Sequence, residues 1–179
     1  MPSSSWSDTE VTSLREDHRN EGIDSPTVWE RVANRRWGTY TSEIARCAIL
    51  RSHQISGEPK AALEIGCEGG RWSQLLASLG WKMTCVDTDP EALKVCQKRM
   101  PTATCVLAKA SDEKIPSEAD SIDLLLCIEV APVIQSHWFI SEAARVLRAR
   151  GLIVGVFWNR WSPRGVFVRR RGDKDLYKY

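Results

Sequence analysis

AALEIGCEGGRW, residues Ala61–Trp72, is the stretch of sequence from which the fold follows. Its first residues are apolar except for Glu64, as in a buried strand, and the run after the loop has the apolar spacing of a helix. Between them, Gly66, Gly69 and Gly70 let the backbone turn tightly and approach a ligand closely, while the N-terminus of the helix presents unpaired N–H groups. We therefore expect a ligand to bind over this loop.

The pattern of a strand followed by a helix repeats along the rest of the chain. We expect strands at 61–65, 82–87, 104–108, 122–128 and 151–158, and helices at 71–80, 89–100 and 136–150. Asp89 followed by Pro90 is typical of a helix start. The near-continuous apolar runs at 122–128 and 151–158 favour strands that are covered on both faces. The sequence therefore predicts an α/β fold with a three-layer, doubly wound and mostly parallel sheet.

The segments that flank this pattern differ from it in composition. Residues 1–24 are polar and carry few core-forming side chains, so we expect an arm without fixed structure. Ser25 and Pro26 are typical of a helix start, and apolar residues then recur at helical spacing, with Gly38 as the point where the helix could break. We predict one domain over 25–179, made of a helical cap at 25–56, a core at 60–159 and a basic tail at 160–179.

Composition narrows the class of protein. The 25 basic and 23 acidic side chains leave a net charge of +2, which disfavours a nucleic acid partner. The start of the chain lacks a secretory signal, and the longest apolar stretch, 122–134, is shorter than a membrane-spanning helix, so we expect a soluble protein without a membrane partner. Six cysteines without a C-x-x-C pair and three scattered histidines favour reduced thiols, a cytoplasmic location and no bound metal.

Polar or reactive side chains lie at the carboxyl ends of three further expected strands. Asp87 ends the second strand, Ser111 and Asp112 follow the third, and Cys127 and Glu129 end the fourth. In a doubly wound sheet, ligands bind beyond the carboxyl ends of the strands, at the point where the winding direction reverses. These residues and the glycine loop are therefore expected to border one crevice.

The spacing of residues around this crevice indicates the class of ligand. Asp87 lies about twenty residues beyond Gly66, the separation at which an acidic residue reaches the vicinal hydroxyls of a ribose, and a carboxylate can accept hydrogen bonds from both. A dinucleotide would need G-x-G-x-x-G, but Glu68 and Arg71 occupy the third and sixth positions, and Glu68 would oppose a pyrophosphate. S-adenosylmethionine has no phosphate, and its cationic groups suit acids such as Glu64. We predict that it is the cofactor.

The sequence also resembles a known family. LEIGCEGGRWSQLLASLGWKMTCVDTDPEAL is similar to the first motif, second strand and next helix of the class I S-adenosylmethionine-dependent methyltransferases. SDEKIP, SIDLLLCIEV and EAARVLRARGLIVGVFWN resemble their later motifs in order, so that the likeness spans residues 27–159 and implies a Rossmann-like methyltransferase fold. The resemblance implies that Glu64, Gly66, Cys67 and Gly70 line the methionine end, that Asp87 holds the ribose, that Ser111 and Asp112 meet the adenine, and that Cys127 lies beneath the sulfonium.

The sequence departs from the family pattern at several points. Glu68 replaces the middle glycine, Ser111 and Asp112 replace an acidic residue just before the adenine position, and the usual P-G-G before the fifth strand is Ala149, Arg150 and Gly151. The family fold also ends in an antiparallel hairpin, whereas the residues after the fifth strand do not resemble two further strands. We therefore expect the C-terminal hairpin to be missing, as in a fragment or an incomplete member of the family.

These observations favour transfer of a methyl group to an O, N or C nucleophile of a small molecule. His137 is a candidate for a general base, with a surface histidine as the alternative, and the sequence identifies no other catalytic residue. Cys67 could be a nucleophile at a helix N-terminus but is better explained as a small buried residue. Trp37 and Tyr40 either close over the cofactor or pack in the core.

Two other classes of function stay open. A cofactor-binding or interaction module that has lost methyl transfer would explain Glu68 and the missing hairpin. A nicotinamide-dependent oxidoreductase would share the fold class, although the mismatch to G-x-G-x-x-G disfavours it.

Overall fold

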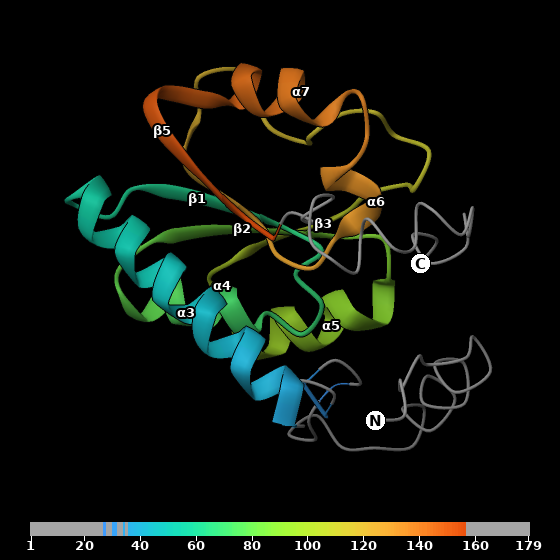
Figure 1. Cartoon of the computed structure of the whole chain (residues 1–179). Coiled ribbons are helices and arrows are strands. Elements are labelled where there is room, and N and C mark those ends of the chain that lie inside the picture. The colour runs from blue at the N-terminus through green and yellow to red at the C-terminus, as the bar shows by residue number, and fades with distance from the viewer. Residues whose placement is uncertain (1–26, 28–29, 32–33, 35, 157–179) are drawn as a thin grey trace, which may run out of the picture.

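The structure is a computed structural model that describes residues 27, 30–31, 34 and 36–156 (Figure 1). The expected N-terminal arm at 1–24 and the expected helix start at Ser25 and Pro26 lie outside the described residues. The expected basic tail at 160–179 and the last residues of the fifth expected strand lie outside them as well.

A parallel sheet of five strands forms the centre of the molecule, in the order β3-β2-β1-β4-β5. The strands are β1 (Ala61–Ile65), β2 (Lys82–Asp87), β3 (Thr104–Leu107), β4 (Ile122–Cys127) and β5 (Leu147–Gly155). All four pairs of neighbouring strands are parallel. The order reverses between β1 and β4, which confirms the predicted doubly wound sheet and puts a ligand crevice at the carboxyl ends of these two strands.

Helices cover both faces of the sheet, as Figure 1 shows. The helices α3 (Arg36–Ser56), α4 (Arg71–Ser78) and α5 (Pro90–Arg99) lie on one face, and α6 (Ala131–Ile134) and α7 (Phe139–Val146) lie on the other. The three layers predicted from the sequence are therefore confirmed. No helix among the described residues combines the length and the apolar character that crossing a membrane requires.

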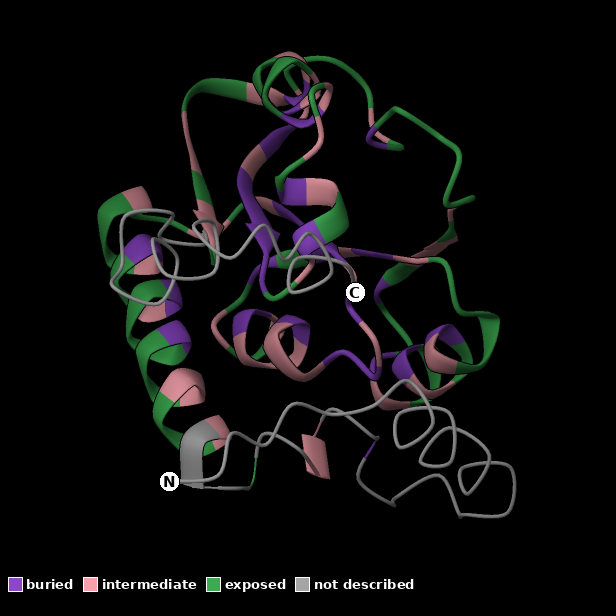
Figure 2. Ribbon diagram, turned by 45° about the vertical axis from the view of Figure 1, so that its right-hand side comes forward, coloured by how far each residue is buried: buried purple, intermediate pink, exposed green. Residues whose placement is uncertain are grey.

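The central strands are apolar on both sides because each side meets a layer of helices. Along β1, Ala62 packs in the core beneath α3, α4 and α5, whereas Leu63 and Ile65 pack with the core beneath α6 and α7. Along β4, Leu124 and Leu125 divide between the two cores in the same way. In Figure 2 the central strands and the inward faces of the helices are buried, and the outer face of α3 is exposed.

The start of α5 follows the sequence prediction. The Asp89 carboxylate accepts hydrogen bonds from the backbone N–H groups of Glu91 at 2.9 Å and Ala92 at 3.5 Å, and Pro90 occupies the first turn. This satisfies backbone donors that the first turn of a helix leaves unpaired.

Two details of the expected secondary structure are wrong. The helix expected over 136–150 is α7, which ends at Val146, and the chain turns directly into β5 at Leu147. Leu147 pairs with Ile122, and the register then shifts before Leu124 pairs with Leu152, so the intervening residues bulge from the sheet. Strand pairing at Leu147 and the ion pair of Arg148 with Asp123 on β4 hold this segment in the sheet rather than in a helix.

The second difference concerns Gly38, because the helical region is interrupted at the turn of Asn34, before α3, and not at this glycine. Helix α3 runs through this residue without a break, and the Thr41 hydroxyl donates to the Gly38 carbonyl at 3.1 Å. Packing of α3 against α4, β4 and β5 outweighs the weak helix propensity of one glycine.

Candidate cofactor-binding site

A cleft opens at the carboxyl ends of the strands, over the glycine loop. It has a volume of about 160 Å³, and its lining includes Gly66 after β1, Asp87 at the end of β2 and Asp112 after β3. Its apolar walls come from Ile65, Ile115, Val130, Val133 and Trp138. The structure thus brings three of the predicted site residues together around one apolar cleft.

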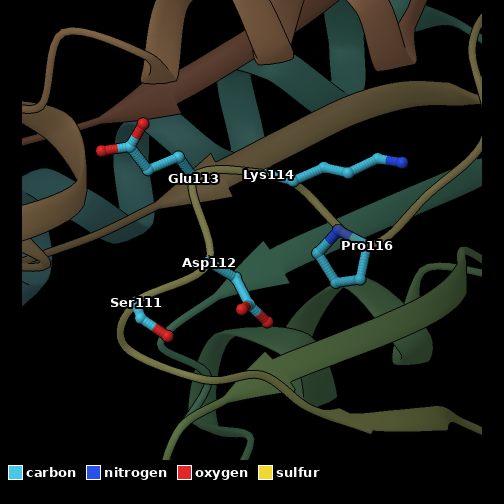
Figure 3. A pocket seen from close by; sticks show the side chains of 5 residues that line it. All are labelled: Ser111, Asp112, Glu113, Lys114 and Pro116. Atoms are coloured by element: carbon cyan, nitrogen blue, oxygen red, sulfur yellow. The ribbon is translucent and has the colours of Figure 1, made fainter.

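A more open hollow of about 430 Å³ adjoins this cleft. It is lined by Ser111, Asp112, Glu113, Lys114 and Pro116 (Figure 3), of which Asp112, Lys114 and Pro116 also line the cleft. Figure 3 shows that Glu113 and Lys114 leave the loop in opposite directions. Asp112 closes a turn in this loop, because its backbone N–H donates to the Lys109 carbonyl at 2.9 Å and its carboxylate accepts from the Lys109 N–H at 3.2 Å.

The Asp87 carboxylate joins the glycine loop to the end of β2. One oxygen, Oδ2, accepts from the Glu68 N–H at 2.8 Å, and the other, Oδ1, accepts from the Thr88 N–H at 2.7 Å and the Asp89 N–H at 3.0 Å. A carboxylate offers about four acceptor positions, so these three bonds leave one, on Oδ2. The spacing in the sequence predicts that Asp87 accepts from two ribose hydroxyls, but beside these three bonds there is room for one.

The backbone of the glycine loop adopts the left-handed conformation at two positions that matter for the cleft. Gly66 has φ of +69°, and its N–H donates to the Val86 carbonyl at 2.8 Å. Glu68, which stands where the family has a glycine, has φ of +47°. A side chain in this region costs about 1–2 kcal/mol. The loop therefore keeps a glycine-like shape at Glu68 and directs its N–H at Asp87.

Glu64 lies beneath the cleft rather than in its lining. It is 2% exposed, and its carboxylate accepts a hydrogen bond from the Ser73 hydroxyl of α4. Burial raises the pKa of Glu64 to about 8, so the carboxyl is largely protonated at neutral pH. Cys127 is fully buried, and burial together with the nearby Glu64 raises the pKa of its thiol to about 12. The predicted contacts of both residues with the cofactor stay predictions.

Protonation of Glu64 makes the stability of the fold depend on pH. Between pH 4.5 and about 8 the folded state keeps a proton that the unfolded state has released, so stability falls as pH rises and levels off above pH 8. We expect a total loss of roughly 3–5 kcal/mol from this group. Urea unfolding of the Glu64→Gln variant from pH 5 to 9 should lack this slope, whereas the exposed Glu91→Gln variant should keep it. An equal slope in wild type and Glu64→Gln would contradict the prediction.

Cys67 and Gly70 support the loop from below. Cys67 is 3% exposed and packs in the core beneath α4 and α5. A Cβ atom on Gly70 would approach Met100 Cε to 2.7 Å and Cys96 Sγ to 2.9 Å. Neither residue is in the lining of the cleft, and a role at the methionine end of the cofactor stays a prediction for both.

Comparison with known proteins identifies the family. The sequence profile described as "Methyltransferase domain" matches residues 63–155, from β1 to the end of β5. The chain belongs to this methyltransferase family. The class I members of the family use S-adenosylmethionine, as the resemblance implied, and a relative in Mycobacterium tuberculosis H37Rv is named a probable S-adenosylmethionine-dependent methyltransferase. That relative is 27% identical over 168 residues, which cover 90% of this chain and 55% of the relative.

Other relatives agree with this assignment. An uncharacterized methyltransferase-like protein of Schizosaccharomyces pombe is 34% identical over 145 residues, which cover 78% of this chain and 54% of that protein. A protein of Mycobacterium ulcerans named "Probable phthiotriol/phenolphthiotriol dimycocerosates methyltransferase 2" is 32% identical over 123 residues, which cover 62% of this chain and 46% of that protein. The chain spans about half the length of the curated relatives that it matches.

Solved structures support the methyltransferase fold. A protein of Pyrococcus horikoshii matches with a TM-score of 0.58 at 16% identity, covering 78% of this chain and 61% of that one. A S-adenosylmethionine-dependent methyltransferase of Methanosarcina mazei matches with a TM-score of 0.55 at 21% identity, covering 69% of this chain and 64% of that one. At these identities the likeness concerns the fold alone.

In this methyltransferase domain, an ion pair ties the N-terminal segment to the glycine loop. Arg99 of α5 donates to Glu30 at 2.7 and 3.2 Å and to the Gly69 carbonyl at 3.2 Å. Thr27 and Glu30 cap each other, since the Thr27 N–H donates to the Glu30 carboxylate and the Glu30 N–H donates to the Thr27 hydroxyl. Although burial favours the protonated form, hydrogen bonds from Arg99 and Thr27 hold the pKa of Glu30 below its usual value.

We expect this ion pair to stabilise the domain because both side chains are more than four-fifths buried. The Arg99→Met variant removes the Arg99 hydrogen bonds to Glu30 and the Gly69 carbonyl and leaves Glu30, among the described residues, only its bond from the Thr27 N–H, at a cost of about 1–3 kcal/mol in the free energy of unfolding. Lys94→Met is the matched control, since Lys94 lies on the same helix and pairs with Glu91 at a well-exposed site, where the loss should be below about 1 kcal/mol. Equal urea midpoints for the two variants would contradict this prediction.

His137 precedes Trp138 of the cleft wall in the chain but is not itself in the lining of the cleft. Its imidazole is 82% exposed, and its Nε2 lies 3.6 Å from a carboxylate oxygen of Glu113. Tyr40 is 58% exposed on α3 and does not line the cleft, and the side chain of Trp37 lies outside the described residues. The roles predicted for His137, Trp37 and Tyr40 remain predictions.

The residues that form the apolar walls of the cleft are not among those predicted from the sequence. Val130, Val133 and Trp138 follow β4 and belong to the short helix α6 and the turn before α7. Ile115 could have been found, because it is the one large aliphatic residue in the polar connection 110–121, and it is 1% exposed.

Proposed function

We propose that this chain binds S-adenosylmethionine in the cleft over Gly66 and Asp87 and transfers its methyl group to an O, N or C nucleophile of a small molecule. The arrangement of Asp87 carries the proposal: its carboxylate borders an apolar cleft at the reversal point of the sheet and retains one acceptor position for a ribose hydroxyl. The relative whose name includes phthiotriol supports a small-molecule acceptor.

The residues of the cleft suit the parts of this cofactor. Ile115 and Val130 offer apolar surface for a purine ring, and Ser111 and Asp112 lie where polar contacts to adenine would be made. The methionine end would lie over Gly66, where the backbone can approach it closely. The cleft volume of about 160 Å³ is below the usual range for ligand sites, so we infer that the adjoining hollow also takes part in binding.

The reaction is a direct displacement. A lone pair of the acceptor forms a bond to the methyl carbon while the sulfur keeps the electron pair of the broken bond and becomes a neutral thioether. The protein contributes alignment, at a near-attack distance of about 3–3.5 Å, and exclusion of water. A general base is needed only where the acceptor must lose a proton, and His137, next to Trp138 in the chain, is our candidate.

Isothermal titration with S-adenosylmethionine, followed by turnover assays across a panel of acceptors, tests the proposal. Binding with turnover supports it. Binding without turnover on any acceptor would favour the alternative, a cofactor-binding or interaction module, for which Glu68 in place of the family glycine is the specific motive. Absence of binding would remove both.

We also propose that residues 25–179 form one domain and that the protein works in the cytoplasm. All six cysteines are free thiols, which suits a reducing compartment. The small net charge supports a small-molecule acceptor over a nucleic acid.

A further inference from the structure

Four cysteine side chains gather beneath the glycine loop, and we call them the thiol cluster. They are Cys67 of the loop, Cys85 of β2, Cys96 of α5 and Cys105 of β3. The sulfur atoms of Cys67, Cys85 and Cys96 all lie within 4.8 Å of one another. The sulfur of Cys105 lies 3.8 Å from that of Cys96.

The topology of the sheet explains why residues so far apart in sequence meet. Cys85 and Cys105 are direct partners in the register of β2 and β3, so their side chains leave the same face of the sheet. Helix α5 packs on that face and contributes Cys96, and the loop after β1 contributes Cys67. The sequence shows no pair of closely spaced cysteines, which is why it led us to expect no metal.

We propose that the thiol cluster is a binding site for a thiophilic metal ion, with Zn²⁺ as the first candidate. Thiolates are the preferred ligands of such ions, and four cysteines can complete a tetrahedral site. With Zn–S bonds of about 2.3 Å, the sulfurs of such a site are about 3.8 Å apart. The separation of Cys96 and Cys105 already matches this edge. The sulfurs of Cys67, Cys85 and Cys96 would need to close by about 1 Å or less, and Cys105 would have to turn toward Cys67 and Cys85 to complete the site.

The surroundings of the cluster suit metal ligands. The Ser73 hydroxyl of α4 accepts a hydrogen bond from the Cys85 thiol at 3.2 Å, which helps to fix the position of this sulfur. Cys67, Cys85 and Cys96 are buried, whereas Cys105 is half-buried on the edge strand β3 and provides a route of entry.

Metal titration of the reduced, chelator-treated chain tests this proposal without reference to methyl transfer. Cys47→Ser serves as the background, because Cys47 is exposed and could bind metal by itself. Cd²⁺ should produce an ultraviolet thiolate-to-metal charge-transfer band that saturates at one ion per chain, and Zn²⁺ should abolish it by competition. Saturating Zn²⁺ should also raise the Tm, as expected for a ligand that binds the folded state preferentially.

Cysteine variants test whether the Cd²⁺ band comes from the thiol cluster or from another thiol. Cys85→Ser should remove the band, Cys105→Ser should weaken Cd²⁺ binding at least tenfold, and Cys127→Ser, which alters a buried cysteine outside the cluster, should leave it unchanged. Far-ultraviolet circular dichroism checks that each variant folds, and Cys105→Ser at the half-buried edge position keeps the test valid if Cys85→Ser does not fold. No saturable band in the fully reduced background protein, or an equal band in a folded Cys85→Ser variant, would overturn the proposal. Unchanged affinity in Cys105→Ser would overturn the assignment of the fourth ligand.

Discussion

The Asp87→Ala variant should bind S-adenosylmethionine about 10- to 150-fold more weakly than the wild type, a loss of about 1.5–3 kcal/mol. Two effects contribute. The variant removes the acceptor that we assign to a ribose hydroxyl, and it releases the N–H groups of Glu68, Thr88 and Asp89 that the carboxylate now holds. Isothermal titration measures the change directly.

A neighbouring residue provides the control for Asp87. Asp89→Ala removes the N-cap of α5, which costs about 1 kcal/mol of stability, but Asp89 does not line the cleft. Its affinity for the cofactor should therefore stay within about twofold of the wild type. If Asp87→Ala binds as tightly as Asp89→Ala, Asp87 does not hold the cofactor and the proposed site loses its main support.

The Gly66→Ala variant should be destabilised by about 2–4 kcal/mol, the largest effect that we expect from a single methyl group in this fold. Gly66 has φ of +69°, which an alanine adopts only with strain, and the added Cβ would overlap Cγ2 of Val130 in the wall of the cleft. Cofactor affinity should fall as well, because both residues line the cleft. Urea unfolding and isothermal titration measure the two losses.

Gly57 makes it possible to separate strain from overlap. Gly57 has φ of +76°, and a Cβ at this position would meet no atom within 4 Å, so Gly57→Ala carries the conformational cost alone, about 1–2 kcal/mol. In the Val130→Ala background, which removes the overlapping Cγ2 atom, Gly66→Ala should cost no more than Gly57→Ala. A full-sized loss that persists in that background would show that Val130 is not the cause.

The regular elements could be predicted because local and tertiary preferences agree in them. The residues of β1 are apolar and bounded by a glycine loop, and Asp89 with Pro90 starts α5 in the expected way. The end of α7 could not be predicted, because the residues up to Arg150 suit a helix and only pairing of Leu147 with Ile122 on another strand ends it. Tertiary pairing overrides helix propensity there.

In the candidate site, too, some residues could be predicted from the sequence and some contacts could not. Gly66, Asp87 and Asp112 could be found because each lies at or after the carboxyl end of a strand, and these strand ends meet at one edge of the sheet. The three hydrogen bonds that occupy Asp87 and the burial of Glu64 against Ser73 depend on three-dimensional packing that spacing does not encode. The thiol cluster is the clearest case, since its members come from four separate elements.

The bulge in β5 limits how far a strand from another molecule can pair with this edge of the sheet. In the described part of the chain β5 is an outermost strand, and a flat outermost strand is a template for unwanted pairing between molecules. The register shift and the exposed side chains of Arg148 and Arg150 break that template over the first half of the strand. Only residues 152–155 keep the regular geometry that another strand, from the same or a different molecule, could extend.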